Sequence, residues 1–253
     1  MLDYRTTISS IDQYNRNITT AKSRIELTSI QLENVCGLLR EAKEIAIEQS
    51  AIDDQAGREN AVQQITYIYD SIFATANDKY GDAYLFAGHK TSTEPFAKDA
   101  DYEATYNGDS GEINIIVGEG AQVKINVTGN EVFTGVDVTS GTNIFDDLKA
   151  LKDALEAEPY NSTEVSDLVG NFVKGVDQVE GAVIKQSITY KRLESTEKHW
   201  DRFKLNIEDM LSKTEDADLA KAIVELQAQK TAYEVTLAAG AGMFDKSLIN
   251  FLR

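Results

Sequence analysis

A heptad repeat runs through residues 4–49, which read YRTTISSIDQYNRNITTAKSRIELTSIQLENVCGLLREAKEIAIEQ. Every seventh residue from Tyr4 to Ala46 is apolar. Residues seven apart return to the same side of a supercoiled α-helix, so they form one continuous stripe. A single helix cannot bury its own stripe, and we expect partner helices to cover it. The predicted bundle seam consists of Ile11, Ile18, Ile25, Leu32 and Leu39.

A second helix is predicted directly after this one. Asp53 or Asp54 can cap its first turn, and apolar residues at 3/4 spacing continue from Val62 to about Gly81. The connection between the two helices is only a few residues long, which makes them antiparallel neighbours.

The pattern changes in residues 97–143, which hold seven of the 16 glycines. Ile113, Ile115 and Val117 recur with a period of two, as do Val123, Ile125 and Val127, with a turn sequence at residues 118–120 between them. Residues 102–106 form a third alternating run. Alternation with a period of two is typical of strands with one buried face. We therefore predict a small antiparallel β meander inserted into a helical protein.

Helical spacing returns at Ile144 and continues to the C-terminus. A short helix is expected to end before Pro159, because proline cannot continue a helix. A longer helix of roughly 50 residues follows from Val165, and a final helix is expected to open near Asp216.

The predicted fold is mainly α with an inserted β domain. It is an elongated antiparallel helical bundle or coiled coil, with the small antiparallel β domain at the tip. The predicted domains are a discontinuous helical rod of residues 1–96 and 144–215, an inserted β domain of residues 97–143, and a C-terminal assembly helix of residues 216–253.

The composition excludes several classes of function. The 253 residues include 25 Lys and Arg against 42 Asp and Glu, which gives a net charge of -17. Binding to nucleic acid or to an anionic membrane surface needs clustered basic residues, so neither partner is expected. No apolar run approaches the length of a membrane-spanning helix, and membrane insertion is not expected. The single cysteine, Cys36, excludes an intrachain disulfide.

The sequence contains no recognisable catalytic motif. His89 and His199 lie far apart, and neither has a nucleophile or carboxylate at a known spacing. The acidic run that begins at Asp99 resembles the start of a calcium loop. Such a loop needs glycine at its sixth position and a carboxylate at its twelfth, where this chain has Ala104 and Ser110. We therefore expect no catalytic residues, no cofactor and no metal.

Several segments resemble those of one known family. Residues 84–96, YLFAGHKTSTEPF, fit the signature Y-L-F-x-G-x-K-T-x-T-x-P-F, and YNGD follows at residues 106–109. The family's last helix resembles DADLA at residues 216–220 and SLINFL at residues 247–252. On these segments, and on IDQY at residues 11–14, the chain resembles bacterial flagellar hook-associated protein 3, the hook–filament junction protein of the flagellin-like family. The resemblance also implies that the family's usual N-terminal segment is missing.

The resemblance implies a structural subunit that joins the flagellar hook to the filament through helix packing between subunits. It implies export through the flagellar type III apparatus and an extracellular location in the flagellum, without a cleaved Sec signal. Expected partners are hook-associated protein 1, flagellin, copies of itself in a ring, and an export chaperone. Two alternatives stay open, a flagellin or flagellin-like filament subunit and a cytoplasmic coiled-coil binding module.

The C-terminal helix is the expected assembly interface. Its apolar face at 3/4 spacing consists of Leu219, Ile223, Leu226, Tyr233, Leu237, Phe244, Leu248, Phe251 and Leu252. In the family this helix pairs with the N-terminal segment, so we expect the face to be uncovered in an isolated subunit and available to neighbours. The alternative is that the helix folds back onto its own bundle.

Overall fold

The computed structural model describes residues 2–51 and 54–251, with side chains described for residues 3–51, 54–215 and 219–240. The described residues form four α-helices: α1 (Leu2–Ala51), α2 (Gln55–Ala76), α3 (Ile144–Glu156) and α4 (Ser162–Phe251). Contacts divide the chain into two compact units. We call Gln13–Lys198 the central unit, and Met1–Asp12 with His199–Arg253 the terminal unit. The prediction of a mainly helical chain is confirmed.

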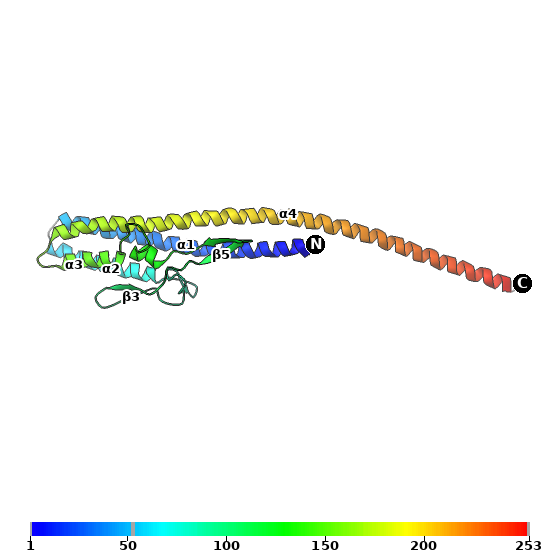
Figure 1. The fold of residues 1–253 in the computed structure, drawn as a ribbon, viewed down its shortest axis with the longest axis horizontal. Coiled ribbons are helices and arrows are strands. Elements are labelled where there is room, and N and C mark those ends of the chain that lie inside the picture. Colours follow the sequence, from blue (N-terminus) through cyan, green and yellow to red (C-terminus); the bar gives the residue numbers. More distant parts are fainter. Residues whose placement is uncertain (1, 52–53, 252–253) are drawn as a thin grey trace. The chain divides into compact units, whose positions relative to one another are not determined.

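Short antiparallel strands separate α2 from α3 in the central unit (Figure 1). They pair two by two: β1 (Lys79–Tyr80) with β2 (Ala83–Tyr84), β3 (Phe96–Lys98) with β4 (Ala104–Tyr106), and β5 (Asn114–Gly118) with β6 (Ala121–Lys124). A π-helical turn, η1 (Asn130–Thr134), follows. The predicted β insertion is therefore present, but among the described residues its strands form local pairs rather than one continuous meander.

Side-chain caps begin α2 and α3. The Asp54 carboxylate accepts a hydrogen bond from the Gly57 amide at 3.0 Å, and the Asn143 side chain accepts one from the Phe145 amide at 3.1 Å. Each cap satisfies an amide that has no partner within the first helical turn. α2 ends at Ala76, earlier than the predicted Gly81, because the Asn77 side chain exchanges two 2.9 Å hydrogen bonds with the backbone of Phe96 in β3.

α4 is one helix from Ser162 to Phe251, so the prediction of a new helix near Asp216 is wrong. Asp216 could cap a helix, but a cap starts a helix only where the preceding one has ended. The sequence contains no proline after Pro159 and no glycine between Gly181 and Gly240. Nothing in the sequence therefore stops α4 before the candidate cap.

The heptad stripe of α1 is buried from Ile11 to Ala46. The five seam residues of the predicted bundle are each at most 1% exposed. In the central unit, the companion row of smaller residues, Ala21, Thr28, Val35 and Ala42, is buried as well. Two neighbouring rows of buried residues give α1 an apolar face wide enough to contact several elements at once.

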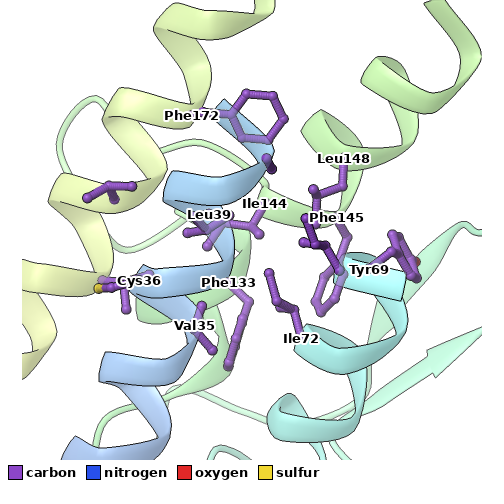
Figure 2. Close-up of a cluster of buried hydrophobic side chains, with 14 of the residues drawn as sticks. Val35, Cys36, Leu39, Tyr69, Ile72, Phe133, Ile144, Phe145, Leu148 and Phe172 are labelled. Carbon is purple, nitrogen blue, oxygen red and sulfur yellow. The ribbon is translucent and has the colours of Figure 1, made fainter. Parts of the chain in front are cut away.

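The main core of the central unit joins the four helices to the β segment, as Figure 2 shows. α1 contributes Leu39, and α4 contributes Phe172. In this view Phe133 of η1 lies between Val35 of α1 and Ile72 of α2. Its ring centroid lies 5.8 Å from that of Phe145 and 5.4 Å from that of Phe96 in β3, both within the range of favourable aromatic pairs. The β segment therefore supplies part of the core of the helical unit.

Within the central unit, the β segment lies along the sides of the helices (Figure 1). The Asn17 amide of α1 donates a hydrogen bond to the Ile116 carbonyl of β5 at 2.9 Å. Buried Arg24, about two turns further along α1, donates a hydrogen bond to the Leu85 carbonyl at 3.3 Å. Alternation in the sequence indicates one buried face, but it does not indicate which elements lie beside it. Here these two hydrogen bonds place the segment beside α1.

The contacts also bear on the predicted domains. Phe96, Val127 and Phe133 belong to the same core as the helices, and the compact units divide near residues 12 and 198. The predicted division into a rod of residues 1–96 and 144–215, a β domain of residues 97–143 and an assembly helix of residues 216–253 stays a prediction.

We predict that Phe133→Ala lowers the free energy of unfolding by about 3–5 kcal/mol, because it removes a fully buried ring shared by β segment and helices. Urea denaturation followed by helical circular dichroism measures the change. Val136→Ala is the matched control, since Val136 is 73% exposed and should change stability by less than about 0.5 kcal/mol. Equal effects of the two variants would show that the β segment is not part of this core.

We also predict that Gly37→Ala raises the free energy of unfolding by about 0.5–1 kcal/mol, since alanine is the better helix former. A Cβ at Gly37 meets no atom within 4 Å. Gly88→Ala is the contrasting variant, because Gly88 has φ +68° and its Cβ would lie 2.1 Å from the Asp109 carbonyl oxygen. The same denaturation experiment should show that Gly88→Ala lowers the free energy of unfolding. A loss of stability in Gly37→Ala would contradict the open environment of this residue.

Candidate assembly surface

The predicted interface residues lie on the part of α4 that belongs to the terminal unit. Five of them have described side chains, each between 55% and 67% exposed: Leu219, Ile223, Leu226, Tyr233 and Leu237. At 3.6 residues per turn these five fall within roughly 80° of the helix circumference. The structure therefore places them together as one apolar stripe, which we call the α4 stripe. The side chains of the other four, Phe244, Leu248, Phe251 and Leu252, lie outside the described residues.

One charged residue interrupts the α4 stripe. Lys230 lies on the same face, between Leu226 and Tyr233. In a heptad seam, a single lysine at such a position selects the register or the partner at some expense in stability. Lys230 forms no ion pair with another described residue. Its ammonium group is therefore available to an acidic residue of a partner.

The opposite side of the same helix is also apolar, which the sequence prediction missed. Val224 and Val235 are 68% and 62% exposed, and Ala228 lies between them. These positions are roughly 140–180° around the helix from Leu219. Residues 219–240 contain only four charged residues, Lys221, Glu225, Lys230 and Glu234. A helix that is apolar on opposite sides is normally packed by more than one neighbour. Plotting the residues at 100° intervals would have revealed this second stripe.

Within the terminal unit, the first turns of α1 cover the part of α4 that comes before Leu219. Ile11 and Ile207 are 1% and 5% exposed. Lys204 Nζ lies 2.6 Å from Asp12 Oδ1, and this hydrogen bond raises the pKa of Lys204. Arg5 and Glu215 form a further ion pair at 2.7 Å. Beyond it, every described side chain from Leu219 to Ala239 is exposed. These residues therefore make no contact that would support the alternative, in which the α4 stripe folds back onto its own bundle.

The signature at residues 84–96 has a structural role in the central unit. Gly88 adopts a positive φ that lets its backbone approach Asp109. The Asp109 carboxylate accepts hydrogen bonds from the amides of His89 and Gly111 at 2.7 and 2.8 Å, which lower its pKa. The Tyr106 hydroxyl donates to the backbone, with the Phe86 carbonyl at 2.8 Å. These hydrogen bonds stabilise the β segment, which is a structural role rather than a catalytic one.

Of the other chemically notable residues, His89 and His199 are exposed and Cys36 is buried. His199 lies against Phe203 with nearly parallel rings 6.3 Å apart, and His89 Nε2 lies 2.8 Å from the Glu112 carbonyl oxygen. Burial raises the pKa of Cys36 to about 11, so its thiol is protonated at neutral pH. Among the described residues, no group of three His, Cys, Asp or Glu side chains is arranged to hold a metal ion. None of the helices in that part of the chain has the length and apolar character that a membrane crossing requires.

The fold and the exposed stripes define a class: a mainly helical chain with a small β insertion and one helix that is apolar on two sides without cover. No protein-family model and no curated protein sequence matches the chain. Several solved structures match it closely in fold.

These solved structures are flagellar hook-associated and junction proteins. A Vibrio parahaemolyticus protein assigned to the flagellar hook-associated proteins gives a TM-score of 0.76 at 21% identity, over 84% of this chain and 94% of that one. Flagellar hook-associated protein-3 of Legionella pneumophila gives 0.76 at 15% identity, over 85% and 99%. FlgL of Bacillus cereus gives 0.68 at 16% identity, over 81% and 97%. The chain therefore has the fold of the flagellar junction proteins, as the sequence segments suggested.

We predict that Tyr233→Ser changes the free energy of unfolding by less than about 0.5 kcal/mol, because the side chain is 66% exposed. Ile207→Ser, in the same helix but 5% exposed, should lose about 2–5 kcal/mol. Thermal unfolding in dilute solution compares the two variants. A large loss in Tyr233→Ser would mean that the α4 stripe is covered within the monomer.

Proposed function

We infer that this chain is a structural subunit of the bacterial flagellum that joins the hook to the filament by helix packing between subunits. The observation that carries the proposal is the exposed part of α4. It is apolar on two opposite sides, and it occurs in a fold shared with flagellar hook-associated proteins over nearly their whole described length. Such a helix is complementary to neighbouring helices rather than to a small molecule.

This role defines the partners and the location. The subunit would contact hook-associated protein 1 on one side and flagellin on the other, with further copies of itself completing a ring. It would be exported unfolded through the flagellar type III apparatus with an export chaperone, without a cleaved Sec signal, and would act outside the cell. The function is contact between subunits, so we propose that the protein is not an enzyme.

Immunogold electron microscopy tests the proposal. An epitope inserted after Glu119, in the exposed turn between β5 and β6, should leave the helices intact. With the tag in the chromosomal gene, label should collect at one position between hook and filament. Label along the whole filament would indicate a flagellin-like subunit instead. Label confined to the cytoplasm would indicate a coiled-coil binding module, and either result would overturn the proposal.

A substitution pair connects the label to the α4 stripe. Leu226→Asp should abolish label at the junction and reduce motility while the protein still reaches the medium, because it places a charge in the proposed contact. Val136→Asp is the matched control, since it also replaces an exposed apolar residue but lies in the β segment. It should leave both label and motility unchanged. Normal junctions in the Leu226→Asp strain would show that the proposed contact does not use the α4 stripe.

A further inference from the structure

The turn after β4 contains Asn107–Gly108, the one Asn–Gly pair in the sequence. Neither residue belongs to a helix or a strand. Asn107 is exposed, and its side-chain amide forms no hydrogen bond within the described part of the chain. The turn therefore presents an asparagine side chain whose carbonyl carbon is open to attack.

Packing requires glycine at position 108. A Cβ there would lie 2.4 Å from the Tyr106 side chain. Tyr106 cannot move aside without loss, because its hydroxyl donates hydrogen bonds to the carbonyls of Phe86 and Asp109 at 2.8 and 2.9 Å. The missing Cβ also leaves the Gly108 nitrogen unhindered. This nitrogen donates no hydrogen bond to any residue that the structure describes.

Lys90 lies against the same peptide group. Its ammonium group donates a hydrogen bond to the Asn107 carbonyl oxygen at 3.1 Å and lies 3.5 Å from the Gly108 carbonyl oxygen. When the Gly108 nitrogen loses its proton, resonance shares the negative charge with the Asn107 carbonyl oxygen, since both atoms belong to one peptide group. A cation that donates to this oxygen stabilises the anion. Lys90 therefore favours the nucleophilic form of the Gly108 nitrogen.

We propose that Asn107 is a site of spontaneous deamidation that Lys90 assists. The deprotonated Gly108 nitrogen attacks Cγ of Asn107, and a new carbon–nitrogen bond forms. The Nδ2 group takes up a proton and leaves as ammonia, so the product is a cyclic succinimide. Water then adds to either ring carbonyl and breaks its bond to the ring nitrogen, which regains a proton. The products are aspartate and isoaspartate, and water is the only co-reactant.

Isoaspartate adds one carbon to the main chain in a segment that is anchored on both sides. The Asn107 amide donates to the Pro95 carbonyl at 2.8 Å, and the Asp109 amide donates to the Ala87 carbonyl at 3.1 Å. The Asp109 carboxylate also accepts from the His89 amide at 2.7 Å. A longer main chain between these anchors displaces one of them. We therefore expect the isoaspartyl form to be less stable than the parent.

Peptide mass spectrometry of the full, folded chain tests the site. During incubation at neutral pH, the Asn107 peptide should gain the mass that replacement of an amide NH2 group by a hydroxyl produces. It should also separate into an aspartyl and an isoaspartyl form. Asn161 is the internal control, because it is also exposed but is followed by Ser162 and accepts a hydrogen bond from the Thr163 amide at 3.1 Å. The Asn161 peptide should convert more slowly.

Substitution of Lys90 separates the effect of the fold from that of the Asn–Gly pair. In the folded chain, Lys90→Gln should slow conversion about threefold or more, as expected for loss of an exposed charge contact. Lys90→Arg keeps the cation and should stay within about twofold of the parent. Lys191→Gln removes an exposed lysine from α4 and should leave the rate unchanged. In concentrated urea, where Lys90 no longer lies at the turn, all four proteins should convert at one rate.

Circular dichroism checks that each variant is folded before incubation. Lys90→Met is a second neutral variant, used if Lys90→Gln does not fold. Anion-exchange chromatography separates the converted protein, because conversion adds one negative charge. Its isoaspartyl form should unfold at lower urea than the parent. Asn107→Asp is the matched control, since it carries the same charge without the additional main-chain carbon, and it should unfold close to the parent.

Two results would overturn the inference. Conversion of Asn107 in urea but not in the folded chain would show that the fold protects this turn. Equal rates in the folded parent and in both neutral Lys90 variants would show that Lys90 does not assist the reaction. These measurements use purified protein and do not depend on where the protein acts. The proposed junction role could therefore stand while this inference fails, and the reverse.

Discussion

The fold of the central unit depends on covering the apolar stripe of α1. Each buried Leu or Ile of such a stripe contributes roughly 1.5–3 kcal/mol, but only if other elements exclude water from it. α4 packs along α1 throughout the central unit, as the Lys22–Glu197 pair at 2.6 Å and the Arg40–Glu180 pair indicate. α2 and α3 complete the core where the stripe approaches the C-terminal end of α1. The β segment lies beside the earlier turns, at Asn17 and Arg24.

This role of the β segment explains its unusual polar contacts with the helices. Short strand pairs leave many backbone groups without partners, and such groups must be satisfied where they are buried. Arg24 reaches the carbonyls of Tyr84 and Leu85, and Asn77 pairs with both backbone groups of Phe96. A buried arginine is expensive to desolvate, and burial lowers the pKa of Arg24. The same side chain joins the β segment to α1, so helix and insertion depend on each other.

Periodicity in the sequence was sufficient to predict the helices, the β insertion and their order, because a repeat of seven or of two residues fixes which side chains share a face. It could not predict what lies against each face. The alternation at residues 113–117 indicated a buried side but not that α1 contacts the segment through the Asn17 hydrogen bond. The capping residue Asp216 suggested a helix start, yet α4 continues through it because nothing stops the preceding turns. In the candidate site, the stripe from Leu219 to Leu237 was predicted, whereas the opposite side was missed because only one 3/4 series was followed.

The uncovered part of α4 is stable as a helix for a reason separate from packing. Starting a helix is the unfavourable step, and each further residue adds a hydrogen bond once the first turns exist. The covered turns before Glu215 supply that start, and the alanine-rich sequence after Leu219 extends it readily. The exposed stripes are therefore already ordered before any partner binds. A partner that buries them loses less free energy to ordering than it would with a disordered segment, so more of the apolar burial appears as affinity. A long helix held at one end is thus well suited to joining subunits, because the part that folds the chain and the part that binds its neighbours are turns of the same element.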